Sequence, residues 1–538
     1  MIHCPNCNAE IKTGVKKCDE CGYEVVSKKS SHSAKNSKGF KGTLKVIIPV
    51  VAVLIVVAVV VSVVFAPSST ANYFGYFRDN EMFISDFSEG YGEQATESFK
   101  SNNIVFGNYR DFVRLSNDGK RLFYIDNYEG TSYKLYSKNL SNLNSKPLKI
   151  TSDVLIYDIS DDGAIVSYIK NNGYLYQHNL KTQSDLIDKD VINFVASDNG
   201  KTILYQKNSE GDKTYQFDLY ISKSGGKGKK LVSNVDSFKY ISQDFSTVYY
   251  LADGSLFKLV IGKKPVKLVD NVRETIKVYD SGEAYYTQTD KDGKTSLYYY
   301  NGSKSSKALI ENYYRAESVS AERPVMVFCC DGEEITYNVV VKDKVFKIEQ
   351  SVVSIALNSA GTELHFTADF DAQNYLTTLY SAKIDNSLKN VKKVTSGVFQ
   401  GKYLSGDKYV YVKDYNTSTM TGTVYFDNKL VAENVYYNAL KYSEKNNMLL
   451  YFDKFEDSNA RLNKFVDGKS SAIRDNVLIN SLSVYNDSKV VFIADCFTDD
   501  GILYVYDGGN TIKIDHDVSS AFTIITNEEY DLKAHTNF

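Results

Sequence analysis

Four cysteines near the N-terminus are the residues whose types and spacing indicate a defined chemistry. Cys4 and Cys7 are separated by two residues, and so are Cys18 and Cys21. Two such C-x2-C turns present four thiolates in the tetrahedral arrangement that Zn²⁺ prefers. Because four Cys ligands leave no open position for a substrate, the spacing predicts one structural Zn²⁺ as cofactor and no catalytic metal. Two disulfides are the alternative, and the reducing compartment inferred below disfavours them.

The segment around these cysteines, residues 1–26, is too short to build a hydrophobic core, so metal binding is expected to fold it. It resembles the short zinc ribbons at the cytoplasmic N-terminus of many single-pass membrane proteins, especially in Gram-positive bacteria. The resemblance covers about residues 3–25 and rests on the four cysteines. Such ribbons bind nucleic acid in some proteins and protein in others, so the resemblance implies zinc without fixing a partner. A cytoplasmic protein is one candidate.

Catalytic motifs are missing from the rest of the chain, which contains no G-x-S-x-G, no H-E-x-x-H and no G-x-x-x-x-G-K-[ST] sequence. The histidines beyond the ribbon and linker are scattered, and we interpret them as surface or hydrogen-bonded residues rather than bases; they are His178, His365, His516 and His535. Acidic pairs such as Asp161-Asp162 and Asp499-Asp500 fall in tight turns, where Asp is favoured for backbone reasons, with calcium binding as an alternative.

Three further cysteines lie in the long C-terminal part of the chain. Cys329 and Cys330 are neighbours in the strand-like sequence VMVFCC. Neighbouring strand residues face opposite sides, so one sulfur is expected inside and the other toward a neighbouring sheet or solvent. We interpret both as inert. A vicinal disulfide and a bridge to Cys496 remain alternatives.

The apolar stretch at residues 46–66, VIIPVVAVLIVVAVVVSVVFA, decides where these parts of the chain lie. It contains no charged residue, and as a helix it would be about 30 Å long, the thickness of the hydrocarbon core of a bilayer. In lipid only a helix satisfies all the backbone groups of such a segment. The sequence therefore predicts one transmembrane helix and an integral membrane protein.

Residues 27–45 precede this span and hold six Lys and no acid among Ser, Gly and Asn, which predicts a flexible basic linker. The first charge after the span is Arg78, so the charge bias places the N-terminus in the cytoplasm and the C-terminal bulk outside the plasma membrane. A cleaved signal peptide is the competing interpretation. Its apolar region would be shorter, and Pro67 follows the only small-residue cleavage pattern.

Composition predicts that the C-terminal bulk, residues 67–538, is mainly β. The chain has 43 Tyr and 28 Phe but no Trp, and Tyr and Phe favour half-buried pleated surfaces. The net charge of −3 combines about +5 in residues 1–45 with about −8 in the remainder. An acidic ectodomain makes nucleic acid an unsuitable partner for it.

A repeat of about forty residues runs through this bulk. Each unit contains a hairpin with a tight turn, as in LSNDGKRLFY (115–124), then a Leu-Tyr pair such as Leu135-Tyr136, and it closes on a valine. The closing valines are Val154, Val191, Val235, Val272, Val352, Val398, Val435, Val477 and Val518. The double spacing between Val272 and Val352 predicts two units with one marker lost near Asn312.

Four short strands per repeat predict the blades of a β-propeller, about ten or eleven in all. The LSNDGK turn at 115–120 resembles the turns of WD40-like and TolB-type propellers, a resemblance that covers about residues 105–530 and implies a fold rather than an activity. Packed β-sandwich domains are the alternative. Residues 73–86 and 521–533 are each a partial unit, and we expect them to complete one blade together. One wide ring and two smaller propellers are both compatible with the repeat; we favour two.

These features together predict a membrane-anchored extracellular binding module that recognises a protein, peptide or cell-envelope ligand and senses or scaffolds at the envelope. The alternative is a propeller enzyme, a hydrolase or lyase, whose central channel gathers acids from separate blades. The turns between the second and third strands vary most in length, so we expect recognition on the face that carries them. The longest are residues 208–216, 369–375 and 414–422.

Overall fold

The computed structural model describes residues 2–3, 10–11 and 73–526, with gaps at 80, 89–91, 96–112, 130–131, 143–144, 183, 211–215, 333, 486–488 and 497–499. The predicted zinc ligands, the linker at 27–45 and the span at 46–66 lie outside these residues. A short antiparallel pair, β1 (Ile2–His3) and β2 (Glu10–Ile11), is described within the predicted ribbon. Within the described residues no helix is long and apolar enough to cross a membrane, and no group of three or more His, Cys, Asp and Glu residues could hold a metal ion.

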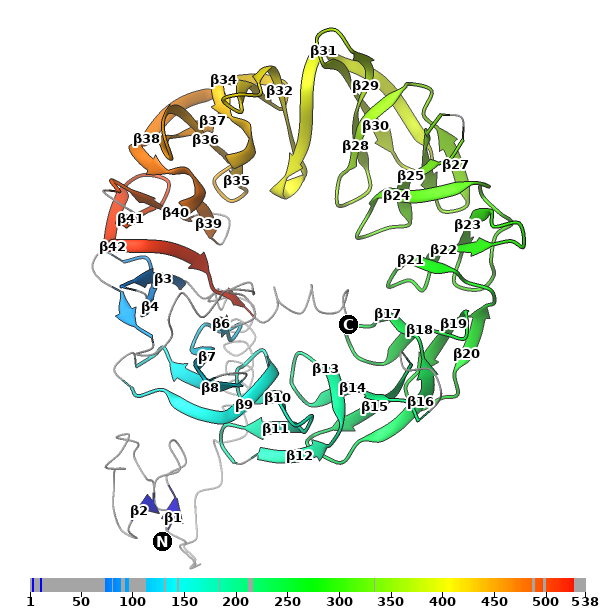
Figure 1. The fold of residues 1–538 in the computed structure, drawn as a ribbon, viewed down its shortest axis with the longest axis vertical. Helices are drawn as coiled ribbons and strands as arrows, with labels where there is room; N and C mark the ends of the chain where they lie inside the picture. Colours follow the sequence, from blue (N-terminus) through cyan, green and yellow to red (C-terminus); the bar gives the residue numbers. More distant parts are fainter. Residues whose placement is uncertain are drawn as a thin grey trace, which may run out of the picture.

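The described part of residues 73–526 forms a β-propeller of eleven blades arranged in a single ring (Figure 1), and its strands pair antiparallel except β43 (Ile525–Thr526), which pairs in parallel with residues 114–115. We name the blades A to K in chain order, starting from β6. The strands of the first five blades are, for A, β6 (Val113–Leu115), β7 (Arg121–Glu129), β8 (Ser132–Asn139) and the first half of β9 (Leu148–Ile159); for B, the second half of β9, β10 (Ile165–Lys170), β11 (Leu175–Asn179) and β12 (Ser184–Asp188); for C, β13 (Val191–Ala196), β14 (Thr202–Asn208), β15 (Phe217–Lys223) and β16 (Lys229–Val235); for D, β17 (Ser237–Ile241), β18 (Thr247–Ala252), β19 (Ser255–Val260) and β20 (Val266–Val269); and for E, β21 (Glu274–Val278), β22 (Ala284–Thr289) and β23 (Thr295–Tyr300).

The remaining blades follow the same order. They are, for F, β24 (Tyr313–Val319), β25 (Val325–Cys330), β26 (Thr336–Val341) and β27 (Lys344–Lys347); for G, β28 (Val352–Leu357), β29 (Glu363–Asp371), β30 (Leu376–Ile384) and the first half of β31 (Leu388–Leu404); for H, the second half of β31, β32 (Lys408–Asn416), β33 (Thr421–Phe426) and β34 (Lys429–Tyr436); for I, β35 (Lys441–Ser443), β36 (Met448–Glu456), β37 (Asn459–Val466) and β38 (Lys469–Leu478); for J, β39 (Ser483–Tyr485), β40 (Lys489–Ala494), β41 (Gly501–Tyr506) and the first half of β42 (Thr511–Thr523); and for K, the second half of β42, β3 (Phe74–Arg78), β4 (Glu81–Ser85) and β5 (Glu93–Gln94). Three short 3-10 turns, Ser405–Asp407, Tyr437–Ala439 and Ile479–Ser481, interrupt the strands.

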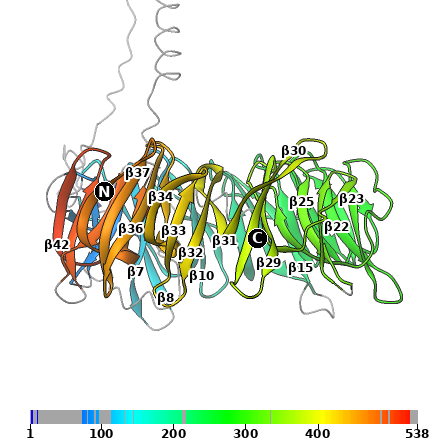
Figure 2. The same ribbon diagram turned by 90° about the horizontal axis from the view of Figure 1, so that it is seen from above.

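Within each blade the strands are ordered from the centre of the ring outward, and neighbouring strands alternate in direction (Figure 1). The first and third turns therefore lie at one face of the ring, and the second turn and the link to the next blade lie at the other. We call these the first-turn face and the second-turn face. Figure 2 shows the ring edge-on, with the strands running between the two faces.

Eleven separate hydrophobic clusters of buried side chains hold the described ring together, one at each junction of neighbouring blades. The cluster between blades K and A combines Phe77 and Phe522 with Val113 and Leu122, so the ring closes on itself. The expectation of two smaller propellers is therefore wrong. The repeat pattern specifies each blade. The angle between neighbouring blades depends on the packing of many side chains at their junction, and the repeat pattern does not reveal it.

The abundance of Tyr and Phe is explained by one cross-strand pair that recurs between the second and third strands. Tyr411 of β32 lies opposite Tyr425 of β33, with ring centroids 5.0 Å apart and planes 4° apart. Such stacked pairs stabilise a sheet beyond the area they bury. Equivalent stacked pairs are Tyr76–Phe83, Tyr124–Tyr136, Tyr168–Tyr176, Tyr205–Tyr220, Tyr250–Phe257, Tyr286–Tyr298, Phe366–Tyr380 and Phe492–Tyr504.

The closing valine of each repeat marks the point where the chain passes to the next blade. In most repeats a left-handed Asp, Asn or Gly stands just before it, as Asn271 (φ 56°) does before Val272. Asp and Asn tolerate this conformation better than most residues. The predicted lost marker near Asn312 is confirmed, because Asn312 has φ 58° and Tyr313 takes the buried position of the valine.

Blade K joins the two ends of the described ring, as the two partial units predicted. The end of β42 pairs with β3, from Phe74 opposite Thr523 to Phe77 opposite Ser520. The fully buried Asp515 of β42 accepts hydrogen bonds from the Tyr76 hydroxyl at 2.8 Å and from the Arg78 guanidinium at 2.8 and 3.0 Å. This ion pair links residues more than 430 positions apart in sequence.

Candidate functional site

The second-turn face carries most of the exposed apolar side chains in the described residues. Nine of the thirteen large ones lie in a second turn or at the start of an innermost strand, and the other four lie on outermost strands. None lies in a first or third turn of the described blades. The nine are Leu155, Ile156, Ile192, Tyr314, Ile335, Val353, Phe370, Tyr375 and Met420.

A recurrent β-bulge in the innermost strand explains several of these exposed side chains. In blade G, Val352 pairs with Ala368 and Ser354 pairs with Thr367, so Val353 is the extra residue and is 49% exposed. A bulge breaks the alternation of a strand and redirects one side chain. The same displacement occurs at Leu155, Ile192, Tyr314 and Phe399 in other blades.

The two long second turns that are described in full, in blades G and H, carry aromatic and sulfur-containing side chains. Phe370 and Tyr375 pack edge to face with centroids 6.1 Å apart, and Tyr375 is 69% exposed. Met420 accepts a hydrogen bond from the hydroxyl of Tyr436 at 3.6 Å. The third predicted loop, 208–216, lies only partly within the described residues. Exposed aromatic and Met side chains are those that protein interfaces favour.

A pocket of about 650 Å³ opens beside Met420 on this face, between blades H and I. Its walls combine the polar turn of blade H with the Glu433 carboxylate and the Phe455 ring. Phe455 packs against Tyr436 with centroids 5.8 Å apart, which fixes one wall of the pocket. The pocket suits a side chain that has both an apolar stem and a polar end.

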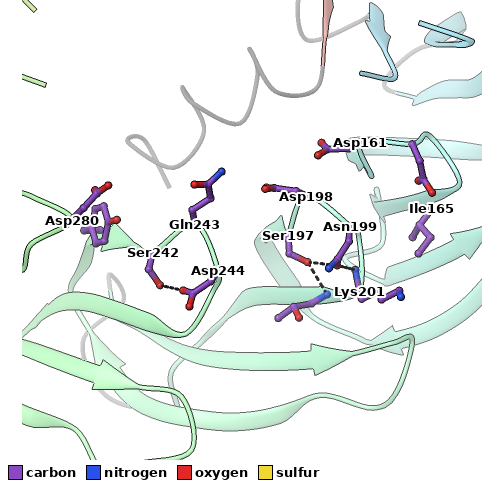
Figure 3. Close-up of a pocket in the computed structure, with 13 residues that line it drawn as sticks. Asp161, Ile165, Ser197, Asp198, Asn199, Lys201, Ser242, Gln243, Asp244 and Asp280 are labelled. Carbon is purple, nitrogen blue, oxygen red and sulfur yellow. Dashed lines mark hydrogen bonds between the residues drawn. The ribbon is translucent and has the colours of Figure 1, made fainter. Parts of the chain in front are cut away.

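A second pocket, of about 870 Å³, lies at the first turns of blades B to E (Figure 3). Five aspartates from four blades line it: Asp161, Asp162, Asp198, Asp244 and Asp280. We call it the acidic pocket. None of the described residues that line it is a histidine.

Some of these aspartates stabilise the turns in which they lie through hydrogen bonds, as the sequence predicted. The Asp162 carboxylate accepts hydrogen bonds from the Ser160 hydroxyl at 2.7 Å and the Ala164 amide at 3.0 Å. Asp244 has the equivalent role in blade D, where the hydrogen bond from the Ser242 hydroxyl is the main reason that its pKa is lowered. Such a carboxylate stays ionised, which suits a cation better than it suits proton donation.

Of the other three aspartates of the acidic pocket, the sequence singled out Asp161 only as part of a tight-turn pair, and Asp198 and Asp280 were missed. Asp161 and Asp198 occupy the residue before the turn aspartate or asparagine, and Asp280 is the equivalent residue of blade E. The turns are tied together, since the Asp161 amide donates to the Asp198 carbonyl at 2.7 Å. The signal in the sequence was an Asp at the x position of the S-x-D-G turn. Only the closed ring shows that this position faces the same pocket in successive blades.

The remaining residues that the sequence singled out do not gather into a site in the described structure. His178 and His516 lie on different blades, and His365 lies between blades G and H. Cys329, Cys330 and Cys496 are free. Cys330 packs in the core between blades E and F, whereas Cys329 donates to Glu317 of its own blade, so the two sulfurs face opposite sides as predicted. Burial raises the pKa of Cys329 to about 11, which keeps this thiol protonated and unreactive. His535 and the predicted zinc ligands Cys4, Cys7, Cys18 and Cys21 lie outside the described residues.

Comparison with solved structures returns propeller proteins at very low sequence identity. A eukaryotic initiation factor is 10% identical over 85% of this chain and 98% of its own, with a TM-score of 0.38. The β-propeller domain of the Trilobed protease from Pyrococcus furiosus is 12% identical over 68% and 97%, with a TM-score of 0.25. An oligogalacturonate lyase from Vibrio parahaemolyticus is 13% identical over 64% and 94%, with a TM-score of 0.27. With TM-scores this low, the assignment as a propeller rests on the arrangement of the sheets.

No protein-family model matches the chain, and no curated protein matches its sequence.

Proposed function

We propose that this protein is a membrane-anchored extracellular binding module whose second-turn face captures a protein or peptide partner. The observation that supports it is the one-sided distribution of exposed apolar side chains, nine of thirteen at the second-turn face of the described ring. When a partner covers exposed side chains such as Tyr375 and Phe370, their apolar surface leaves water, and this burial favours formation of the complex. Their position on irregular loops held by a rigid ring is the arrangement that recognition uses.

The path of the chain into the ring supports the same face. Strand β3 begins at Phe74 opposite Thr523, which is the first-turn end of blade K. The predicted span ends at residue 66, and the six residues that connect it to the first described position of the ring reach about 20 Å at most. In this arrangement the first-turn face lies toward the membrane and the second-turn face points away from it, where an extracellular partner has access. The predicted zinc ribbon would then lie on the cytoplasmic side with its own partner.

Site-specific photo-crosslinking in cells tests this proposal. A benzophenone side chain placed at Tyr375 or Met420 is expected to crosslink to a discrete partner. The same group at Lys342 or Lys445, which are exposed on the first-turn face, is the matched control and should give no such product. If crosslinks form only at the control positions, or at neither face, the proposed function is wrong.

A second candidate function is enzymatic and rests on the acidic pocket. Catalysis in a propeller channel needs acids brought together from separate blades, and the pocket collects Asp161, Asp198 and Asp280 from three of them. Turnover of a glycan or peptide substrate that is abolished by Asp198→Asn and Asp280→Asn, with unchanged thermal stability, would establish this function. Unchanged turnover in both variants would exclude the pocket as its site.

A further inference from the structure

We propose that the partner segment that docks on the second-turn face of blades F to I is a peptide rich in Lys or Arg that also carries aromatic or aliphatic anchors. This inference rests on the proposed function and specifies its ligand. Its starting point is the exposed apolar group made by Tyr314, Ile335, Val353, Phe370 and Tyr375, together with Met420 in the next blade.

The charges around this apolar group have one sign. In the second turns of blades F to I, and in residues 311–312 before blade F and the links that follow blades F, H and I, each taken with one flanking residue, seven of the described exposed residues are acidic and two are basic. The acids are Glu311, Asp331, Glu334, Glu349, Asp371, Glu456 and Asp457, and the bases are Lys347 and Lys441. Lys347 is already paired with Glu349.

The opposite face of the same blades is nearly balanced. In the first and third turns, counted in the same way, six exposed residues are acidic and five are basic. The acids are Glu322, Asp343, Asp385, Asp427, Glu444 and Asp467, and the bases are Lys342, Lys344, Lys429, Lys445 and Lys469. The negative potential is therefore a property of the second-turn face and not of the chain as a whole. Complementary charge steers a basic partner to this face and rejects an acidic one.

The apolar groups and the pocket between blades H and I define what such a partner must carry. Phe370, Tyr375 and Val353 offer surfaces against which apolar side chains can be desolvated. The pocket is lined by the side chains of Glu433 and Phe455, together with Lys454 and with Asp453, which pairs with Arg461. An Arg or Lys side chain fits this combination, because its stem packs on the ring while its charge meets the carboxylate.

Other occupants of this face fit less well. A second copy of the chain would bring two acidic surfaces together, which like-charge repulsion opposes. An anionic bilayer is repelled for the same reason. The basic linker at 27–45 belongs to the segment that enters the ring from the first-turn face, and the predicted span separates it from this surface.

Peptide binding to the full chain in detergent micelles tests the inference. The probe is a fluorescein-labelled peptide in which Lys alternates with Phe, compared with versions in which Glu replaces Lys or Ser replaces Phe. The Lys–Phe peptide is expected to bind at least about tenfold tighter than either, with an affinity that falls as salt is added. Equal binding of the Lys–Phe and Glu–Phe peptides would overturn the inference.

Matched charge-reversal variants locate the site. Glu334→Lys, Glu433→Lys and Glu456→Lys together should weaken Lys–Phe binding about tenfold or more. The control is Glu322→Lys, Asp343→Lys and Glu444→Lys on the first-turn face, which changes the net charge equally and should change affinity less than about twofold. Equal losses in the two variants, or self-association through the second-turn face in sedimentation, would also overturn the inference. If crosslinks at Tyr375 identify an acidic partner instead, the ligand assignment fails while the proposed function stands, and if crosslinks form only at the first-turn face, the function itself fails.

Discussion

The junction between blades G and H should weaken in mild acid because a histidine is held neutral inside it. This junction has the smallest buried core of the described ring, made of Leu379, Val398, Tyr409 and Tyr411. His365 adds to it by stacking on Tyr409, with centroids 4.0 Å apart and planes 11° apart.

The surroundings of His365 oppose its protonation. Its Nδ1 lies 2.7 Å from the hydroxyl of Tyr403, and that hydroxyl donates to the Glu363 carbonyl at 3.3 Å. Burial, and secondarily the positive charge of Lys392, lower the pKa of His365 from 6.5 to about 4. Between pH 4 and pH 6.5, His365 is therefore protonated in the unfolded chain and neutral in the folded chain. The stabilisation is complete above pH 6.5 and falls as the pH drops toward 4, by about 3 kcal/mol for this one group.

Thermal unfolding followed by tyrosine fluorescence at pH 7 and at about pH 4.5 measures the effect. His365→Phe keeps the stacking on Tyr409 and removes the titrating group, so its melting temperature should fall less than that of the wild type on acidification. Hydrogen exchange localises the change, which should be largest in β29 and β32. His516→Gln, where the side chain is 45% exposed, is the control. Identical pH dependence in the wild type and His365→Phe would refute the reasoning.

Four other predictions concern ring closure, backbone conformation, metal binding and membrane topology. Asp515→Ala leaves Arg78 without its buried partner and should destabilise the ring by about 3–5 kcal/mol in thermal unfolding, whereas a loss below 1 kcal/mol would show that the ion pair does not latch blade K. Asn271→Ala keeps a Cβ at φ 56° but loses the polar side chain that makes this conformation tolerable for Asn, so it should cost about 1 kcal/mol, while Asn271→Gly should not, as thermal unfolding of both variants can show. A reduced peptide of residues 1–26 should bind about one Zn²⁺ per chain and unfold on chelation, and metal analysis that finds none would contradict the predicted ribbon. Protease added to intact cells should remove residues 67–538 and spare the N-terminus, and protection of this region would reverse the predicted topology.

The sequence predicted the blade well because each blade is specified locally. The hairpin turn at 115–120, the Leu135-Tyr136 pair and the closing Val154 all lie within one unit, and each acts through neighbours in the same sheet. The pairing of residues 73–86 with the end of β42 was also predictable, since two partial units leave unpaired edges that can satisfy each other.

The arrangement of blades and the two pockets could not be predicted in the same way. The curvature of the ring is distributed over eleven junctions, so no single residue carries it. The bulge at Val353 adds one residue to a strand without changing the apolar pattern around it, and its effect is to turn a side chain outward. Asp161 and Asp280 are separated by more than one hundred residues and meet only because blades B to E curve around the same opening.

The width of the ring helps to compare the acidic pocket with the second-turn face as the functional site. A catalytic group must lie within hydrogen-bond distance of the atoms it acts on, so in a wide ring only adjacent blades can share a reaction centre. The acidic pocket meets that condition over blades B to E, and two of its carboxylates, those of Asp162 and Asp244, are engaged by their own turns. Recognition of an extended partner makes the opposite demand, because affinity accumulates from anchors that are spread over an interface. The arc from Tyr314 in blade F to Phe455 in blade I supplies such anchors on a rigid frame, among turns and links with more exposed acidic than basic residues. On these grounds we favour the proposed recognition of a long basic segment over turnover of a small substrate.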